Sequence, residues 1–198
     1  MLHVLWKASN QGKLNEIRTL LDDTNWLILG LADFNLQDTA IIETGNSYLE
    51  NALAKANHIA KLTGIMTLAD DSGLEVNALG GSPGVVTARF GGPLLNDNQR
   101  CQYLLKLLSD IPKQKRQACF RAVLAISVPG GLSFAREGIL KGYIAQEIRG
   151  ENGFGYDPIF EIQDGRTLAE MGTEKQQISH RFKAIKAIKK VLLDFHHD

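Results

Sequence analysis

The chain begins with a short apolar run that leads almost directly into an amphipathic segment, and this pattern restricts the fold more than any other feature. Residues 2–7 (LHVLWK) have the composition of a buried strand, and residues 11–21 have apolar side chains at helical spacing. The expected apolar face of that helix consists of Leu14, Ile17, Leu20 and Leu21. A strand followed at once by a helix is typical of α/β folds. We therefore expect an α/β fold, with a mixed, twisted sheet flanked by helices.

The rest of the chain predicts further strands and helices. A helix over residues 47–62 is indicated by a capping-box pattern at Ser47 and Glu50 and by an apolar stripe. The stripe consists of Leu49, Leu53, Ala56 and Ala60. The other expected elements are a strand at 65–69, a helix at 98–108, a hairpin of 120–128 and 132–137, a strand at 159–160 and a helix at 183–195. We expect one domain over residues 1–198 whose hairpin region forms a second lobe, leaving a cleft between the two.

Composition excludes several classes of protein. The 22 basic and 22 acidic residues give a formal net charge of +0, whereas proteins that bind duplex nucleic acid usually carry a basic excess. Cys101 and Cys119 have no metal-ligand spacing and are interpreted as reduced thiols of a cytosolic protein. The apolar stretches 26–32 and 122–128 are too short to cross a membrane. We expect a soluble, cytoplasmic protein that binds neither nucleic acid nor membranes.

The loop between the first strand and the first helix has the features of a phosphate site. It consists of Ala8, Ser9, Asn10, Gln11, Gly12 and Lys13. Asn10 is a good helix N-cap, and capping alone would explain it structurally. Lys13 lies in the first helical turn, where the helix dipole disfavours a cation unless an anion is bound there by the lysine and the backbone N–H groups. The spacing of a Walker A loop is absent, so the cap and the phosphate site both remain open.

The segment Asp70-Asp71-Ser72-Gly73 follows an expected strand and places two carboxylates side by side. Because neighbouring side chains of a strand point to opposite faces, one carboxylate can enter a cleft while the other braces the turn. Mg²⁺ prefers one or two carboxylates together with waters and substrate phosphates, and Glu43 could supply the second carboxylate. The structural alternative is an Asx turn ending at Gly73, with Glu43 as a surface acid.

Three further segments could contact a nucleotide. Asn51 and Lys55 share a helix face, which we expect to be solvent-exposed in the absence of other evidence. Phe154, between two glycines, could stack on a flat base, although the same segment could be a packed turn. Arg181, which follows His180, could donate to a keto oxygen and so favour 6-keto purines over adenine. A lone His-Arg pair is more often a surface or ion-paired feature.

Taken together, seven segments resemble one family, the inosine/xanthosine triphosphate pyrophosphatases, which hydrolyse non-canonical purine nucleotides. The segments are Ser9–Lys13, Glu43–Gly45, Glu50–Lys55, Ala69–Leu74, Ser82–Arg89, Gly153–Phe160 and Glu174–Arg181. They occur in the family's order and cover almost the whole chain. The resemblance implies a two-lobed α/β fold with a substrate cleft, a homodimer and a cytoplasmic location. This chain departs from the family at Ala8-Ser9, where Thr-Gly is usual.

The resemblance also implies a reaction and a set of site residues. The reaction is Mg²⁺-dependent hydrolysis of ITP, dITP or XTP to the monophosphate and pyrophosphate, which removes damaged nucleotides from the precursor pool. Asp71 would be the proton acceptor and a metal ligand, and Glu43 the other metal-site acid. The implied substrate contacts are the loop from Ala8 to Lys13 together with Lys55, Ser72, Phe154, Gly155, Tyr156, Asp157, Lys175, His180 and Arg181. The alternative is a non-catalytic nucleotide-binding or regulatory protein of the same fold.

Overall fold

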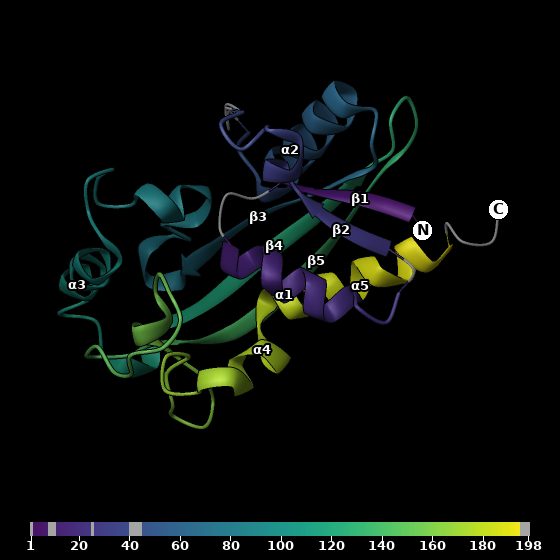
Figure 1. Ribbon diagram of the computed structural model, residues 1–198. Coiled ribbons are helices and arrows are strands. Elements are labelled where there is room, and N and C mark those ends of the chain that lie inside the picture. Colours follow the sequence, from purple (N-terminus) through teal and green to yellow (C-terminus); the bar gives the residue numbers. More distant parts are fainter. Residues whose placement is uncertain (1, 8–10, 25, 40–44, 195–198) are drawn as a thin grey trace. The chain divides into compact units, whose positions relative to one another are not determined.

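The described part of the chain forms a mixed sheet with helices around it (Figure 1). The computed structural model describes residues 2–7, 11–24, 26–39 and 45–194. The strands are β1 (Leu2–Lys7), β2 (Trp26–Gly30), β3 (Thr67–Val76), β4 (Gln117–Ser127), β5 (Ser133–Ile144) and β6 (Phe160–Glu161). They lie in the order β2-β1-β3-β4-β5-β6. β1 pairs in parallel with β2 and β3, and β5 pairs antiparallel with β6, so the predicted mixed sheet is confirmed.

The helices lie largely where hydrophobic periodicity predicts them. They are α1 (Gln11–Leu21), α2 (Tyr48–Thr63), α3 (Asp97–Leu107), α4 (Lys175–Ile178) and α5 (His180–Asp194). The predicted hairpin is also present, because the Val128 N–H donates to the Leu132 carbonyl between β4 and β5. Among the helices of the described ranges, none is both long and apolar enough to cross a membrane.

The chain is divided into two compact units. The first unit contains residues 1–71, 122–138 and 180–198, and the second contains residues 72–121 and 139–179. Strands β3, β4 and β5 contribute residues to both units. The substrate cleft between two lobes and the single domain over residues 1–198 remain predictions.

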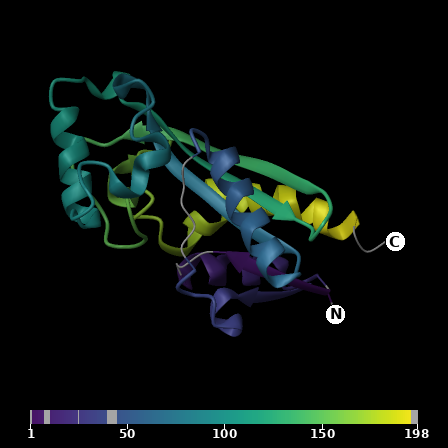
Figure 2. The ribbon, with the colours of Figure 1, turned by 90° about the horizontal axis from the view of Figure 1, so that it is seen from above.

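The first unit has helices on both faces of its strands. Trp6 of β1 is fully buried in a cluster with Ile17 of α1 and Ile188 of α5. Leu5, the preceding residue, is buried instead with Ile59 of α2. Because neighbouring side chains of a strand point to opposite faces, α1 and α5 cover one face and α2 covers the other (Figures 1 and 2). This packing brings both faces of β3 in this unit close to a helix.

The second unit has a separate core beneath α3. Leu104 of α3 is fully buried in a cluster that also contains Leu74 of β3 and Phe120 of β4. The Phe120 ring lies against Phe160, with centroids 4.6 Å apart. The two units therefore have independent hydrophobic cores.

Neither cysteine has the character of a nucleophile. Cys101 and Cys119 are both free thiols. Burial, with a smaller contribution from nearby carboxylates, raises the pKa of Cys101 to about 12. Burial and a hydrogen bond to Glu75 raise the pKa of Cys119 to about 11. Both thiols are therefore protonated at neutral pH, and protonated thiols are poor nucleophiles.

The predicted apolar stripe of α2 is wrong at its first position. Leu49 is 46% exposed, whereas Ala52 and Ala56 are fully buried. The helix is rotated relative to the prediction because its buried face also includes two polar residues, Asn51 and Lys55. The capping box is only half formed, since Ser47 accepts from the Glu50 N–H but the Glu50 carboxylate accepts from the Asn46 N–H instead.

Two predicted boundaries are also wrong, and both concern the candidate site. The segment Asp70–Gly73 is not a turn, because β3 continues through it to Val76. The last helix begins at His180 rather than at residue 183, so His180 and Arg181 occupy its first turn. Three lysines of that helix, Lys183, Lys186 and Lys190, are exposed.

Candidate active site

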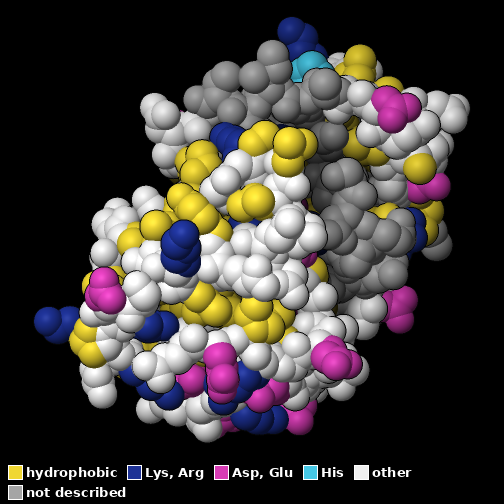
Figure 3. Space-filling view, turned by 90° about the vertical axis from the view of Figure 1, so that its left-hand side faces the viewer, with side chains coloured by type: hydrophobic (Ala, Val, Ile, Leu, Met, Phe, Trp, Pro, Cys, Tyr) yellow, Lys and Arg dark blue, Asp and Glu magenta, His cyan; other side chains and the backbone are white. Residues whose placement is uncertain are grey.

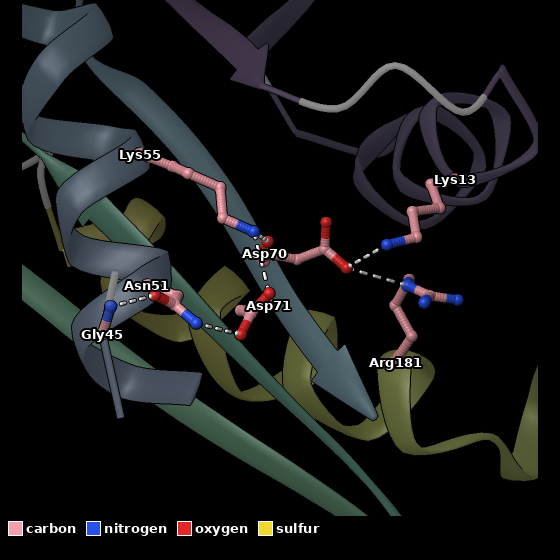
Figure 4. A network of polar contacts seen from close by, with 7 residues as sticks. All are labelled: Lys13, Gly45, Asn51, Lys55, Asp70, Asp71 and Arg181. Carbon is pink, nitrogen blue, oxygen red and sulfur yellow. Dashed lines mark hydrogen bonds and ion pairs between the residues drawn. The ribbon is translucent and has the colours of Figure 1, made fainter. Parts of the chain in front are cut away.

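Asp70 is the buried counter-ion of two cations that come from different helices. Its Oδ2 atom accepts from Lys13 Nζ of α1 at 2.8 Å and lies 3.5 Å from Arg181 Nε of α5 (Figure 4). The side chains of Asp70 and Arg181 are each 2% exposed. Burial tends to raise the pKa of Asp70, but the charges of Lys13 and Arg181 outweigh it and hold that pKa far below its usual value. Asp70 is therefore ionised at neutral pH.

Asp71 has a different set of partners, as the alternation along a strand predicts. Its Oδ1 atom accepts from Lys55 Nζ at 2.8 Å, and its Oδ2 atom accepts from Asn51 Nδ2 at 3.1 Å (Figure 4). Lys55 also donates to the backbone carbonyl of Asp70 at 3.0 Å. Both donors come from α2, and Asp71 is 8% exposed. The helix thus fixes the orientation of the carboxylate at two points.

The expectation that Asn51 and Lys55 are solvent-exposed is wrong. They are 3% and 8% exposed. Each precedes a fully buried alanine, Ala52 or Ala56, so the polar pair lies beside the apolar face of α2 rather than opposite to it. This neighbouring pair of small apolar residues is the sequence signal that could have indicated burial of Asn51.

The described residues around Asp71 are suited to bind an anionic ligand together with a cation that the ligand coordinates. Three cationic side chains, Lys13, Lys55 and Arg181, face two carboxylates, which leaves one positive charge. Within the described ranges no group of three or more His, Cys, Asp or Glu residues forms a closed metal site. Mg²⁺ does not need one, because it commonly takes one or two carboxylates and completes its shell with water and substrate phosphates. Since each carboxylate oxygen has two acceptor positions, Asp71 can accept the bonds from α2 and also coordinate a cation.

In the second unit, Asp157 organises the loop that carries Phe154. Asp157 Oδ2 accepts from the Phe154 N–H at 2.8 Å and from Lys175 Nζ at 2.5 Å. Lys175 Nζ also lies 4.5 Å from the centroid of the Phe154 ring. Gly153 has a φ of 84°, and a Cβ atom there would lie 2.1 Å from Asp157 Oδ2, so only glycine fits. Phe154 is 40% exposed and therefore presents ring surface on which a base could stack.

Two other residues of this loop have structural bonds. The buried Tyr156 hydroxyl donates to the Thr87 carbonyl at 3.1 Å, and the Gly155 N–H donates to the Asp97 carboxylate at 2.7 Å. Burial raises the pKa of Tyr156 well above its usual value. These contacts hold the loop in place, and direct contact of Tyr156 with a substrate remains a prediction.

The predicted site residues fall into three groups. Those in the first unit are Gln11 and Gly12 in the first turn of α1, Lys13, Lys55, Asp71, His180 and Arg181. Those in the second unit are Ser72, Phe154, Gly155, Tyr156, Asp157 and Lys175. Ala8, Ser9, Asn10 and Glu43 lie outside the described residues. The structure therefore brings together a carboxylate and cation cluster in one unit and an aromatic loop with Lys175 in the other. Sequence reasoning missed Asn51 as a partner of Asp71 and left the role of Asp70 open.

Comparison with known proteins defines the class to which this fold and site belong. The profile of the Ham1 family matches residues 4–191. A dITP/XTP pyrophosphatase of Thermus thermophilus is 47% identical over 189 residues, covering 94% of this chain and 90% of that protein. The dITP/XTP pyrophosphatase of Bacillus subtilis is 43% identical over 194 residues, covering 97% and 98%. The chain therefore belongs to the Ham1 family.

Solved structures agree with this assignment. A Ham1 protein from Coxiella burnetii superposes with a TM-score of 0.91 at 39% identity, covering 98% of this chain and 100% of that one. The Ham1 protein of Staphylococcus aureus gives a TM-score of 0.88 at 35% identity, with coverage of 98% and 99%. The family resemblance of the seven sequence segments is thereby confirmed.

Proposed function

We propose that the chain hydrolyses the non-canonical purine nucleoside triphosphates dITP, ITP and XTP to the monophosphate and pyrophosphate. The observation that carries this proposal is the Asp71 carboxylate, held by Lys55 and Asn51 beside an excess of cationic side chains. The full-length relatives named dITP/XTP pyrophosphatase support the substrate class. A non-catalytic nucleotide-binding protein of the same fold is the less favoured alternative.

Asp71 is the group that orients and deprotonates the attacking water. The water oxygen forms a bond to the α-phosphorus, the bond from that phosphorus to the α–β bridging oxygen breaks, and pyrophosphate leaves with the electron pair. Asp71 and Glu43 would hold Mg²⁺, which would neutralise phosphate oxygens as the charge on them grows. Lys55 and Asn51 keep the carboxylate in one orientation, which general-base catalysis requires.

Lys13 is suited to bind the phosphate chain. It lies in the first turn of α1, and its side chain is 21% exposed although its Nζ atom contacts Asp70. A lysine on a flexible stem can turn from a carboxylate to a phosphate oxygen with little rearrangement. Backbone N–H groups of residues 8–12 would add to this binding, because an anion is favoured at a helix N-terminus. Lys13 and these N–H groups would stabilise the departing pyrophosphate.

The residues proposed to contact the base are the aromatic loop of the second unit and, separately, His180 and Arg181 of the first unit. The exposed ring of Phe154 could stack on a purine, with Lys175 and Asp157 holding the loop in position. The guanidinium of Arg181, whose Nε atom faces Asp70, is proposed to donate to a 6-keto oxygen. A guanidinium donor of this kind would discriminate against adenine, whose amino group cannot accept those bonds. His180 and Ser72 remain proposed substrate contacts.

We also propose that the protein is a cytoplasmic homodimer. The two free thiols are consistent with a reducing compartment. Leu94 is 94% exposed, and Leu107 of α3 in the same unit is 43% exposed. Figure 3, which views the side of the molecule on which α3 lies, shows hydrophobic side chains open to solvent on that face. A partner copy could cover such a surface, and light scattering would measure the resulting mass.

A substrate panel with separate detection of pyrophosphate and orthophosphate tests the proposed function. We expect pyrophosphate release from dITP, ITP and XTP that requires added Mg²⁺. We expect kcat/KM for dITP to exceed that for dATP on the order of 10²-fold, because adenine would leave a buried donor unpaired, at a cost of about 1–3 kcal/mol. Nucleotide binding without pyrophosphate release would support the non-catalytic alternative. Equal specificity constants for dITP and dATP would contradict the role given to the Arg181 side chain.

A further inference from the structure

Asn51 connects two parts of the candidate site that are far apart in the sequence. Its Nδ2 atom donates to Asp71 Oδ2 at 3.1 Å, and its Oδ1 atom accepts from the Gly45 N–H at 2.9 Å (Figure 4). Gly45 follows Glu43 by two residues in the chain. The amide therefore lies between the proposed water-activating carboxylate and the backbone of Gly45.

The chemistry of both neighbours requires a side chain that can both accept and donate a hydrogen bond. A backbone N–H can only donate and an ionised carboxylate can only accept, so the group between them must accept at one end and donate at the other. Asparagine does both in one plane, and the two neighbours also determine which way its amide is turned. A carboxylate at this position could not donate to Asp71, and an aliphatic side chain could make neither bond.

The geometry at Gly45 shows that the bridge is tightly fitted. A Cβ atom on Gly45 would lie 2.6 Å from Asn51 Oδ1 and 2.8 Å from the Glu50 Cβ atom. Real Cβ atoms do not come so close to other heavy atoms, so any side chain at residue 45 would displace the amide or the turn. Because Asn51 is 3% exposed, solvent cannot readily replace the lost bond.

We propose that Asn51 is a positioning residue that sets the rotation of the Asp71 carboxylate and ties it to the backbone at Gly45. The inference rests on the proposed function of Asp71. Lys55 donates to one oxygen of Asp71 and Asn51 to the other. Because these two donors lie four residues apart on α2, this helix alone fixes the plane of the carboxylate. Loss of Asn51 would leave Asp71 in place but free its Oδ2 atom from one donor.

The test compares Asn51→Leu and Asn51→Asp with wild type and with Asn57→Leu. Asn57 lies on the same helix but is exposed, and its contact is with Ser133. We expect both Asn51 variants to lower kcat for dITP about 10- to 100-fold, with KM changed less than about threefold. We expect Asn51→Leu to weaken Mg²⁺ binding, measured by calorimetry in the presence of pyrophosphate, by a similar factor. Asn57→Leu is expected to match wild type in both assays.

A second variant and folding measurements distinguish loss of the Asn51 bridge from a failure of the Asn51 variants to fold. Gly45→Ala breaks the same bridge from its other end and is expected to lower kcat in the same way. Folding of each variant is checked by circular dichroism and urea unfolding. A folded Asn51→Leu or Asn51→Asp protein with wild-type kcat and Mg²⁺ affinity would overturn the inference. If wild type itself released no pyrophosphate from dITP, the proposed function would be wrong instead.

Discussion

Asp71→Asn is expected to lower kcat for dITP hydrolysis by about 10²- to 10⁴-fold, the range typical for loss of a general base. An amide of the same shape can neither take up the proton of the attacking water nor bring a negative charge to a cation. Lys55 and Asn51 both donate to this side chain, and an asparagine has a single acceptor atom for the two of them. The measurement is steady-state pyrophosphate release at saturating Mg²⁺.

Loss of folding has to be separated from loss of chemistry in this variant. One donor loses its acceptor, which is expected to cost about 1–3 kcal/mol of stability and not to unfold the chain. Asp110→Asn is the matched control, because Asp110 is exposed and the chemical change is the same. A folded Asp71→Asn protein that retains wild-type kcat would show that another group activates the water.

The second large effect is expected at Asp70, and it concerns stability. Asp70→Asn removes the counter-charge of the fully buried Arg181 and of Lys13. Removing one partner of a buried ion pair typically costs about 3–5 kcal/mol. Because Lys13 is partly exposed and can regain water, we expect about 3 kcal/mol, which corresponds to a fall in Tm of about 6–12 °C. Urea and thermal unfolding measure the difference.

The stability difference between wild type and Asp70→Asn should depend on pH in one direction. The pKa of Asp70 is lowered in the folded protein, because the charges of Lys13 and Arg181 outweigh the effect of burial. The folded state therefore binds the proton more weakly than the unfolded state, and the stabilisation is fully present above the unfolded pKa of about 4. As the pH falls below that value, the free energy of unfolding of wild type should approach that of Asp70→Asn.

An exposed ion pair provides the control for Asp70. Asp164→Asn breaks the contact with Arg166 at the protein surface, and exposed pairs contribute little to stability. Its urea midpoint should match that of wild type at every pH. An Asp70→Asn variant as stable as Asp164→Asn would show that Arg181 is held by its other contacts and not by this carboxylate.

Local patterns predicted the elements of the fold well where one face of an element is purely apolar. β1 and α1 have the predicted bounds, because the apolar residues of α1 follow a single helical stripe. The prediction failed on α2, where the buried face contains an amide and an ammonium group. A sequence does not reveal that Asn51 and Lys55 are buried unless their partner Asp71 is already placed beside them.

The end of β3 was mispredicted for a related reason. Asp, Ser and Gly disfavour strands, so the segment Asp70–Gly73 resembles a turn. Tertiary contacts override that preference, since Lys13 and Arg181 neutralise one carboxylate and Lys55 holds the next. The identity of the site residues came from the ordered family motifs, whereas their division between two units became visible only in three dimensions.

The central claim, attack of water on the α-phosphorus, is tested most directly by isotope labelling. Wild-type protein is incubated with dITP and Mg²⁺ in H₂¹⁸O, and the products are analysed by mass spectrometry. We predict one ¹⁸O atom in the monophosphate and none in the pyrophosphate. Label in pyrophosphate or in orthophosphate would contradict the account, because water would then have attacked a different phosphorus atom.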